Sequence, residues 1–599
     1  MDNRSIFLSA GILILSLSYL VFTGQQYFSL AAMAGALAVS LIGLALMLLS
    51  YYSNRPETGR NKKLLGILAV LAAASLLILA YESYFDLVST QLPTSTGATL
   101  ATMVCAVLVF AGGAYVMENK VKGRTLEACA FALMLLIALI VVIYLLQSYS
   151  VHAAGWIGTD EMAYDYYAFS LFARGANPYN ATMVPVLTQY KIDPTLELNG
   201  SCACTYDYPA LSFLLPALGA IAGNGYLSAM VFETVALVVL VGLLLYKRSS
   251  GNVYALLPIA AWISIIFYLS PAPLSKYIAV SLFLVVAYLY RTRAMLSSAF
   301  LGLAASTHQL AWVALPFFYL LSLREHGKRA MLKSVLVTAG VFLLLNGYFI
   351  AISPAKTLDN ILSLFTTKTQ FVGPSVMQFL VAFYPTAYWY STALMAIAFL
   401  TMLLLFYFYT DTLKPLIALA PAAIFFLSWR NIAGYGASFV PLLIAVYYSD
   451  VKGKAADALK NRRWAVYAIA LACILAVVLA VYAHGVYIRS NALSITQIST
   501  ALEGNATTGG YVLRGMSVNL TNNQDKAETV YFYLITRDPD RTANVTVVYH
   551  ALPADSYHNY IFGGTYLPGI SSDTKLYIFA LSNDYITGKE VDAVNSSSG

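Results

Sequence analysis

The sequence predicts a mainly α-helical, polytopic membrane protein with a small β-rich domain after the helices. The first observation is composition, because 59% of the 599 residues are hydrophobic and only 11% are charged, against roughly 25% charged residues in an average soluble domain. The second is that apolar runs of about 20 residues, long enough to cross a bilayer, recur up to residue 483. The third is a shift after residue 484, where Asn, Thr, Gly and Tyr replace the apolar runs.

The apolar runs form two groups on either side of a long polar loop. The earlier spans are expected at 6–22, 29–52, 64–81, 98–117 and 128–147. The later spans are expected at 226–246, 253–269, 277–290, 294–308, 310–323, 334–352, 386–409, 415–429, 433–449 and 464–483. The chain is therefore predicted to have four parts, which are a five-span membrane region (1–147), a loop (148–225), a membrane region of about ten spans (226–484) and a β-rich domain (485–599).

The basic residues set the orientation of these spans. Lys and Arg collect in cytoplasmic loops of membrane proteins, and basic clusters follow every second span, as at 55–63 and 452–463. The N-terminus is thus expected to be cytoplasmic, and the 148–225 loop and the C-terminal domain external. Most Asn-x-Ser/Thr sequons, which mark exported surface, agree with this topology: Asn180, Asn199, Asn505, Asn519, Asn544 and Asn595 are external, whereas Asn3 is cytoplasmic.

Two further expectations follow from this topology. The formal charge of +7 resides mainly in cytoplasmic loops, so no nucleic acid partner is expected. The absence of an obvious retention signal favours the plasma membrane as the location of this integral multi-pass protein.

Four segments predict the strands of the C-terminal domain. They are "GGYVLRG" (509–515), "ETVYFYLIT" (528–536), "NVTVVYHAL" (544–552) and "TKLYIFAL" (574–581), which are rich in β-branched and aromatic residues and separated by turn residues. The domain is a candidate lid or acceptor-binding module, and a solvated domain of another use is equally open.

Two cysteines lie in the external loop, in "GSCACTY". The Cys-x-Cys spacing of Cys202 and Cys204 is too short for the usual zinc knuckle. A disulfide or two free thiols are therefore favoured over a metal site.

Several cations break the inward bias of basic residues. Lys276, Lys356, Lys368 and Arg430 fall at or near the outer ends of spans. Cations at the outer leaflet suit a phosphate, which they can hold by charge-assisted hydrogen bonds, although long side chains also snorkel toward lipid headgroups. His308 falls where two apolar segments meet, at the expected outer turn of a helical hairpin, either as a structural residue or as part of a site.

The acidic stretch "GTDEMAYDYYAFSLFARGANPYN" (158–180) is the main candidate for chemistry. In a helix, Asp160 and Tyr164 share one face, and Glu161 and Asp165 lie beside it. Thr159 followed by two acids is also typical of a helix N-terminus, so the acids could merely begin a helix. Alternatively, one carboxylate is a general base that takes a proton from an acceptor hydroxyl in the transition state, while nearby cations stabilise the leaving group.

The segment "TDEMAYDYYAFSLFARGANPY", followed by "YDYPALSFLLPAL", resembles the first external loop of the GT-C glycosyltransferases that use polyprenyl-phosphate sugars. This group includes protein O-mannosyltransferases and aminoarabinose transferases. Its members have an acidic residue, often in an Asp-Glu pair, then an aromatic-rich helix, a Gly-x-x-Pro-Tyr-like turn and a Tyr-x-Tyr-Pro-Pro-Leu-like segment. Here Ala210 replaces the second proline. The resemblance covers residues 156–216 and, more loosely, 270–445.

The resemblance implies an inverting transferase that moves a mannose-like hexose from a polyprenyl-phosphate donor to a hydroxyl on a protein, glycan or lipid acceptor, at the external face of the membrane. It assigns Asp160 as the base and Glu161 as its partner, whereas the family pattern does not require Asp165, which is a third candidate. From their placement in the sequence, the candidates to bind the donor phosphate are Arg430 first, then His308, Lys276, Lys356 and Lys368, and Asp165 and Tyr208 are further candidates to bind the phosphate or the sugar. The Asp-x-Asp and Trp-Trp-Asp motifs of the metal-dependent oligosaccharyltransferase branch are absent near this loop, so no cofactor and no divalent metal is expected.

Other functions remain as alternatives. A multi-span transporter would have internal repeats, broken helices and several buried charges, and the sequence has no convincing repeat. A polysaccharide polymerase or ligase would also have many spans and a large external loop. A non-enzymatic scaffold for the β-rich domain would leave the acidic pair without a role.

Overall fold

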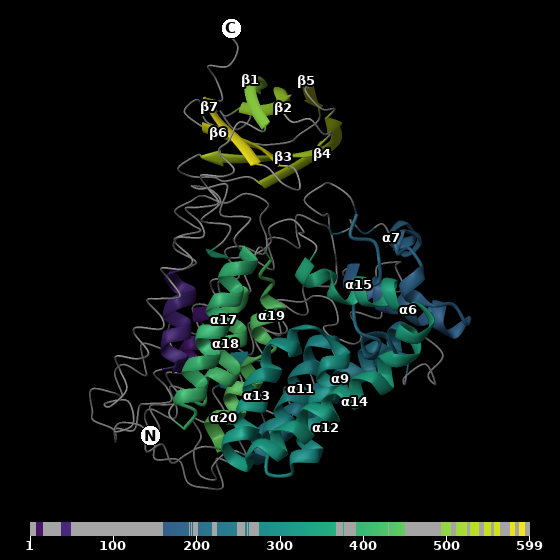
Figure 1. Cartoon of the computed structure of the whole chain (residues 1–599), viewed down its shortest axis with the longest axis vertical. Coiled ribbons are helices and arrows are strands. Elements are labelled where there is room, and N and C mark those ends of the chain that lie inside the picture. The colour runs from purple at the N-terminus through teal and green to yellow at the C-terminus, as the bar shows by residue number, and fades with distance from the viewer. Residues whose placement is uncertain are drawn as a thin grey trace.

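The structure is a computed structural model, and it is mainly helical with strands near the C-terminal end. It describes residues 8–12, 14–15, 38–48, 160–190, 192, 195, 202–217, 225–247, 258–259, 261–262, 275–366, 375–376, 391–411, 413–428, 430–449, 493–504, 511–523, 528–537, 544–552, 556–563, 575–581 and 586–592. The helices form a bundle, and the strands lie together at one end of the molecule (Figure 1).

The bundle contains helices of very different length. They are α9 (Gly225–Lys247), α11 (Ser275–Leu289), α12 (Ala294–Thr307), α13 (Leu310–His326), α14 (Lys328–Ile352), α17 (Ser391–Phe408), α18 (Leu416–Phe425), α19 (Ala433–Ala437) and α20 (Val440–Ser449). Each coincides with an apolar run in the sequence. The spans expected at 64–81, 98–117, 128–147 and 464–483 lie outside the described residues, and those at 6–22, 29–52 and 253–269 are described only in part.

The run at 433–449 differs from its prediction, because the chain forms two helices there instead of one. Pro441 stands in the first turn of α20, where its missing N–H is tolerated, and proline disfavours helical backbone in the residue before it. The break is held in place by Ser438, whose carbonyl accepts a hydrogen bond from the Ser281 hydroxyl at 2.8 Å. This break lies close to the site described below.

Helices α12 and α14 pack closely because small residues line their contact. A Cβ added at Gly302 would lie 2.5 Å from the Cβ of Val341 and 2.9 Å from the carbonyl oxygen of Thr338, so only glycine fits. The hydroxyls of Ser298 and Ser334 are hydrogen-bonded at 2.6 Å across the same contact. Small residues with hydroxyl bonds are typical of helix contacts within membranes.

A second, smaller core forms around the acidic stretch. It contains α6 (Asp160–Ala173), the short helix η1 (Pro178–Asn180), α7 (Val184–Tyr190), α8 (Leu211–Ala217) and α15 (Pro354–Thr366). The helix expected at 159–174 is therefore present. Helices α6, α7 and α15 lie together beside the bundle in Figure 1.

Ala210 connects the two cores. The N–H of Ala210 donates a 2.7 Å hydrogen bond to Oδ1 of Asn346 on α14, and Asn346 is fully buried. A proline at residue 210 would have no N–H for this bond. Ala210 thus ties the segment before α8 to the bundle.

The C-terminal strands form two antiparallel sheets. One has the order β1-β2-β5 and the other β4-β3-β6-β7. The strands are β1 (Leu493–Gly504), β2 (Tyr511–Asn522), β3 (Glu528–Arg537), β4 (Asn544–Leu552), β5 (Ser556–Gly563), β6 (Lys575–Leu581) and β7 (Ile586–Asp592). All four segments expected to be strands are strands, and β1, β5 and β7 are additional.

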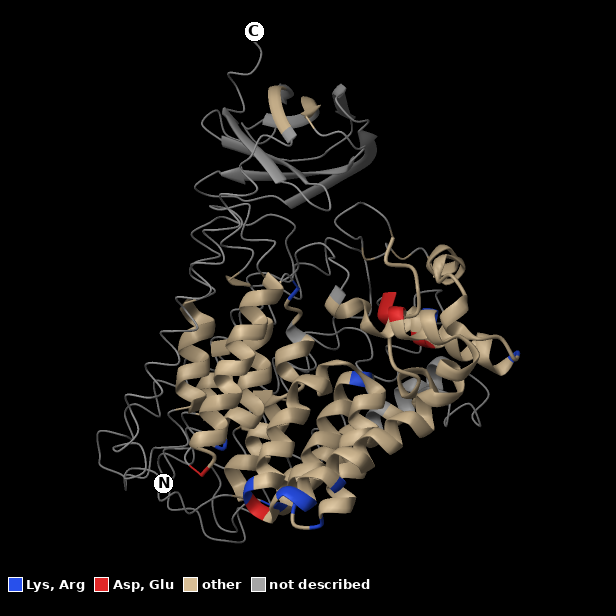
Figure 2. Cartoon of the chain, viewed as in Figure 1, with Lys and Arg blue, Asp and Glu red and all other residues tan. Residues whose placement is uncertain are grey.

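Two of the described helices, α14 and α17, are long and apolar enough to cross a membrane, and several other apolar helices are shorter. Both expose large apolar side chains, and Leu344 on α14 is 81% exposed. Lys and Arg gather at the end of the bundle away from the strands (Figure 2), where the connections from α11 to α12 and from α13 to α14 lie. The acidic first turn of α6 is far from this basic end.

Candidate functional site

A cavity of about 390 Å³ lies where the smaller core meets the bundle. Its polar lining comes from the first turn of α6, from Thr195, from the segment 203–208 and from the residues between α18 and α20. Its apolar lining comes from α13, α15, α17 and α18, and includes Trp312, Leu364, Phe365, Met395, Phe399 and Phe425. The cavity therefore combines a polar part with an apolar wall.

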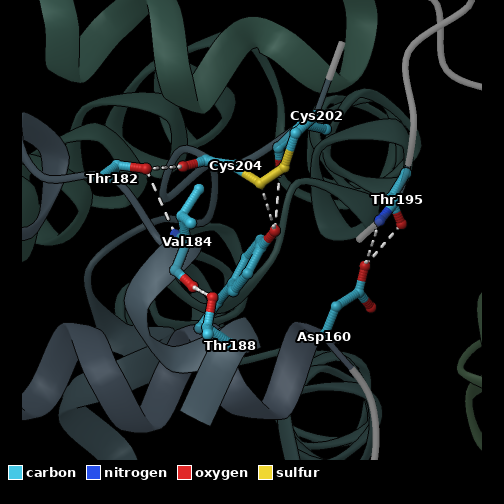
Figure 3. Close-up of a disulfide and its surroundings, with 9 residues drawn as sticks. Asp160, Thr182, Val184, Thr188, Thr195, Cys202 and Cys204 are labelled. Carbon is cyan, nitrogen blue, oxygen red and sulfur yellow. Dashed lines mark hydrogen bonds between the residues drawn. A yellow bond between two sulfur atoms is a disulfide. The ribbon is translucent and has the colours of Figure 1, made fainter. Parts of the chain in front are cut away.

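Asp160 and Arg430 meet in the polar part through a third residue. Oδ2 of Asp160 accepts hydrogen bonds from the Thr195 hydroxyl at 2.6 Å and from its N–H at 3.2 Å, as Figure 3 shows. Two guanidinium nitrogens of Arg430 donate to the same Thr195 hydroxyl oxygen at 3.2 and 3.3 Å. The expected base and the expected phosphate-binding cation thus share one hydroxyl.

Glu161 has different partners, all from α11. The Tyr277 hydroxyl lies 2.8 and 2.9 Å from the two carboxylate oxygens of Glu161, and Nζ of Lys276 lies 3.8 Å from Oε2. A carboxylate engaged at both oxygens is fixed in orientation. Glu161 is therefore held at the cavity wall by the bundle, whereas Asp160 is held by the loop.

Lys276 lies behind the cavity in a buried cluster of charges. Its Nζ is 3.2 Å from Oδ2 of Asp165 and 3.2 Å from the ring centre of Tyr208. Asp165 also accepts 2.8 Å hydrogen bonds from the hydroxyls of Tyr206 and Ser212. Lys276 is thus surrounded by two carboxylates and an aromatic face, which accounts for its burial.

His308 also lies behind the cavity, in the turn between α12 and α13. Its ring is 5.2 Å from Tyr208 and 5.3 Å from Tyr277, measured between ring centres. Its Nδ1 accepts a hydrogen bond from the N–H of Leu310 at 3.1 Å. This arrangement fixes the turn and packs the His308 ring against the two tyrosines.

Asp207 is a third acid of the cavity lining, and it was not among the candidates from the sequence. Burial raises the pKa of Asp207 to about 7, Lys276 opposes this shift, and the charge of Glu161 adds to it. Two buried tyrosines, Tyr206 and Tyr208, flank it, and Tyr208 lines the same cavity. An acid between two tyrosines just before an apolar segment is the signal by which the sequence could have identified Asp207.

A disulfide joins Cys202 and Cys204, which shortly precede Asp207 in the same segment. The Tyr164 hydroxyl on α6 donates to the Ala203 carbonyl at 3.1 Å and lies 3.8 Å from Sγ of Cys204. Figure 3 shows this disulfide beside Asp160 and Thr195. Of the two states expected for these cysteines, the structure has the disulfide.

The candidates from the sequence therefore separate into groups. Asp160, Glu161, Tyr208 and Arg430 line the cavity. Asp165, Lys276 and His308 lie behind the lining, Lys356 is exposed on α15, and Lys368 lies outside the described residues. Residues that were not candidates from the sequence are Thr195, Asp207, Tyr277 and Tyr435, and Tyr164 was indicated only as lying on the helix face of Asp160.

In the part of the chain that the structure describes, no group of three His, Cys, Asp or Glu residues is arranged to hold a metal ion. The sequence matches no family model, no curated protein and no solved structure. The function is therefore inferred from the residues of the cavity.

Proposed function

We propose that this protein is an integral membrane glycosyltransferase that moves a mannose-like hexose from a polyprenyl-phosphate donor to an acceptor hydroxyl at the external face, with inversion. The observation that carries the proposal is a single cavity that combines a carboxylate pair, an arginine and an apolar wall. The polar part suits a sugar phosphate and the apolar wall suits the lipid chain to which it is attached. The acceptor would be a protein, a glycan or a lipid.

The chemistry assigns a role to each charged group. The acceptor oxygen attacks the anomeric carbon while its proton passes to Asp160, and the bond from that carbon to the phosphate oxygen breaks. The leaving polyprenyl phosphate gains negative charge, which the Arg430 guanidinium stabilises with donors that Thr195 does not use. Glu161, fixed by Tyr277 and Lys276, binds the sugar or orients the acceptor.

The multi-span membrane location is part of the proposal. The exposed apolar faces of α14 and α17 support contact with lipid. The basic end of the bundle supports a cytoplasmic side opposite to the acids of α6. A site on the external side requires a sugar donor that is carried in the membrane, and a polyprenyl phosphate meets this requirement. The plasma membrane is the proposed location.

Transfer assays in membranes test the proposal. Radiolabelled polyprenyl-phosphate mannose and polyprenyl-phosphate glucose are offered to the wild type and to Asp160→Asn, with and without a chelator. We expect transfer by the wild type alone and no effect of the chelator, because asparagine keeps the shape of Asp160 and loses its basicity. Equal transfer by Asp160→Asn would refute the role of the base. Absence of both transfer and lipid binding would favour the transporter.

A further inference from the structure

Asp207 has no role in the chemistry above, yet it lies in the same polar part of the cavity. Its Oδ1 is buried and has no hydrogen-bond partner among the described residues. A buried carboxyl oxygen without a partner is costly, so the carboxyl gains from any polar group that reaches it from the cavity. The carboxyl is therefore placed to receive a hydrogen bond from a polar group of a ligand in the cavity.

The backbone around Asp207 is held on both sides. The Gln309 side-chain amide donates both to the Asp207 carbonyl and to the Ile361 carbonyl on α15. The Tyr179 hydroxyl donates to the Tyr208 carbonyl at 2.8 Å, and Tyr206 is bonded to Asp165. A carboxyl on such a fixed segment is preorganised to recognise one position of a ligand.

The charge distribution indicates which ligand group Asp207 contacts. Arg430 is the only cation among the described residues that line the cavity, and it lies with Asp160 and Thr195. A phosphate would be repelled by a second carboxylate but attracted to Arg430. A hydroxyl can donate to an ionised carboxyl or accept from a neutral one, so a hydroxyl fits Asp207 in both states.

We propose, on the basis of the function proposed above, that Asp207 hydrogen-bonds one hydroxyl of the transferred hexose and so determines which sugar the site accepts. A site that hydrogen-bonds a substrate hydroxyl discriminates strongly against an analogue without it, because the protein group is left unpaired. Removal of Asp207 should therefore remove the discrimination at one hydroxyl only.

The test compares the preferred hexose donor with analogues that each lack one ring hydroxyl. We measure kcat/KM for the polyprenyl-phosphate hexose that the wild type uses and for its monodeoxy forms. The wild type should lose about 10- to 100-fold with one analogue. In Asp207→Ala and Asp207→Leu, the kcat/KM values for that analogue and for the parent donor should differ by less than about threefold. Leucine has nearly the shape of aspartate. Because Oδ1 of Asp207 has no hydrogen-bond partner among the described residues, its replacement by an apolar group loses no hydrogen bond of that atom.

Asp359→Ala is the matched control, because Asp359 is an exposed acid on α15 outside the cavity lining. It should retain the full discrimination of the wild type. If both Asp207 variants discriminate as the wild type does, the contact is refuted while the transferase function stands. If the wild type transfers no hexose from any of these donors, the proposed function is refuted and this inference with it.

Discussion

Replacement of Lys276 by methionine separates two roles for this residue. A phosphate-binding lysine would be needed for the donor and dispensable for the fold. In the structure, however, Nζ of Lys276 lies 3.2 Å from Asp165 and 3.8 Å from Glu161, and the side chains of Lys276 and Asp165 are only 3% and 2% exposed. Lys276→Met would leave a buried carboxylate without its counter-charge.

The expected loss is large because the pair is buried. Removal of one member of a buried ion pair costs about 3–5 kcal/mol, mainly because the remaining charge is desolvated and unpaired. Replacement of both members by neutral groups avoids this penalty. The double variant Lys276→Met, Asp165→Asn should therefore recover most of the stability, since asparagine still accepts from the Tyr206 and Ser212 hydroxyls through Oδ1.

The free energy of unfolding in detergent micelles and the donor KM are measured together. Lys276→Met should lower the unfolding free energy by about 3–5 kcal/mol, and the double variant should recover more than half of it. Lys356→Met, at an exposed lysine on α15, is the matched control and should change stability little. Wild-type stability with a raised donor KM in Lys276→Met would show that Lys276 binds phosphate and refute the structural role.

Three other variants have defined outcomes. Ala210→Pro should lower the unfolding free energy by about 1–3 kcal/mol, because it leaves the buried Oδ1 of Asn346 without its donor; unchanged stability would contradict this. Arg430→Lys keeps the charge but loses the fork that binds Thr195, so kcat/KM should fall by about 10- to 100-fold, and wild-type rates would contradict it. Burial raises the pKa of Asp207 from 3.8 to about 7, so the stability that the protonated carboxyl contributes is complete below pH 3.8 and is lost as pH rises to 7. Over this range the free energy of unfolding of the wild type should therefore fall by up to about 4 kcal/mol relative to that of Asp207→Asn, which cannot ionise at this position. Parallel pH profiles of stability for the two proteins would contradict this.

The sequence predicted the helices and strands better than the contacts between them. Apolar runs and alternating β-branched residues are local signals, and they placed α9, α11 and β2 to β4. The break between α19 and α20 was missed, although Pro441 was visible, because the apolar run continues across it. Helix α15 was missed because its length and mixed polarity do not fit a span.

The site was predicted only in part, because contacts between residues far apart in the sequence leave no local signal. Asp160 and Arg430 were each identified by a charge in an unusual place, and the fold brings them together. Their link, Thr195, lies 35 residues from Asp160 and 235 from Arg430. A threonine in a polar loop has no local feature that marks such a contact. Lys276 was identified as an unusual cation, but its partner Asp165 is 111 residues away in sequence, since 276 − 165 = 111.

Two adjacent acids receive different roles because of the geometry of their helix. Successive helical residues project about 100° apart, so Asp160 faces Thr195 and Arg430 while Glu161 faces Tyr277 and Lys276. Asp160 is thus linked to Arg430 through Thr195, whereas Glu161 shares Lys276 with Asp165, and the two cations lie on different parts of the chain. Loss of the Asp160 charge leaves Arg430 bonded to Thr195 at the cavity, where substrate can still bind its other donors. Loss of the Glu161 charge instead leaves Tyr277 and Lys276, which lie outside the cavity lining, with one partner fewer, so the two positions are not interchangeable in function.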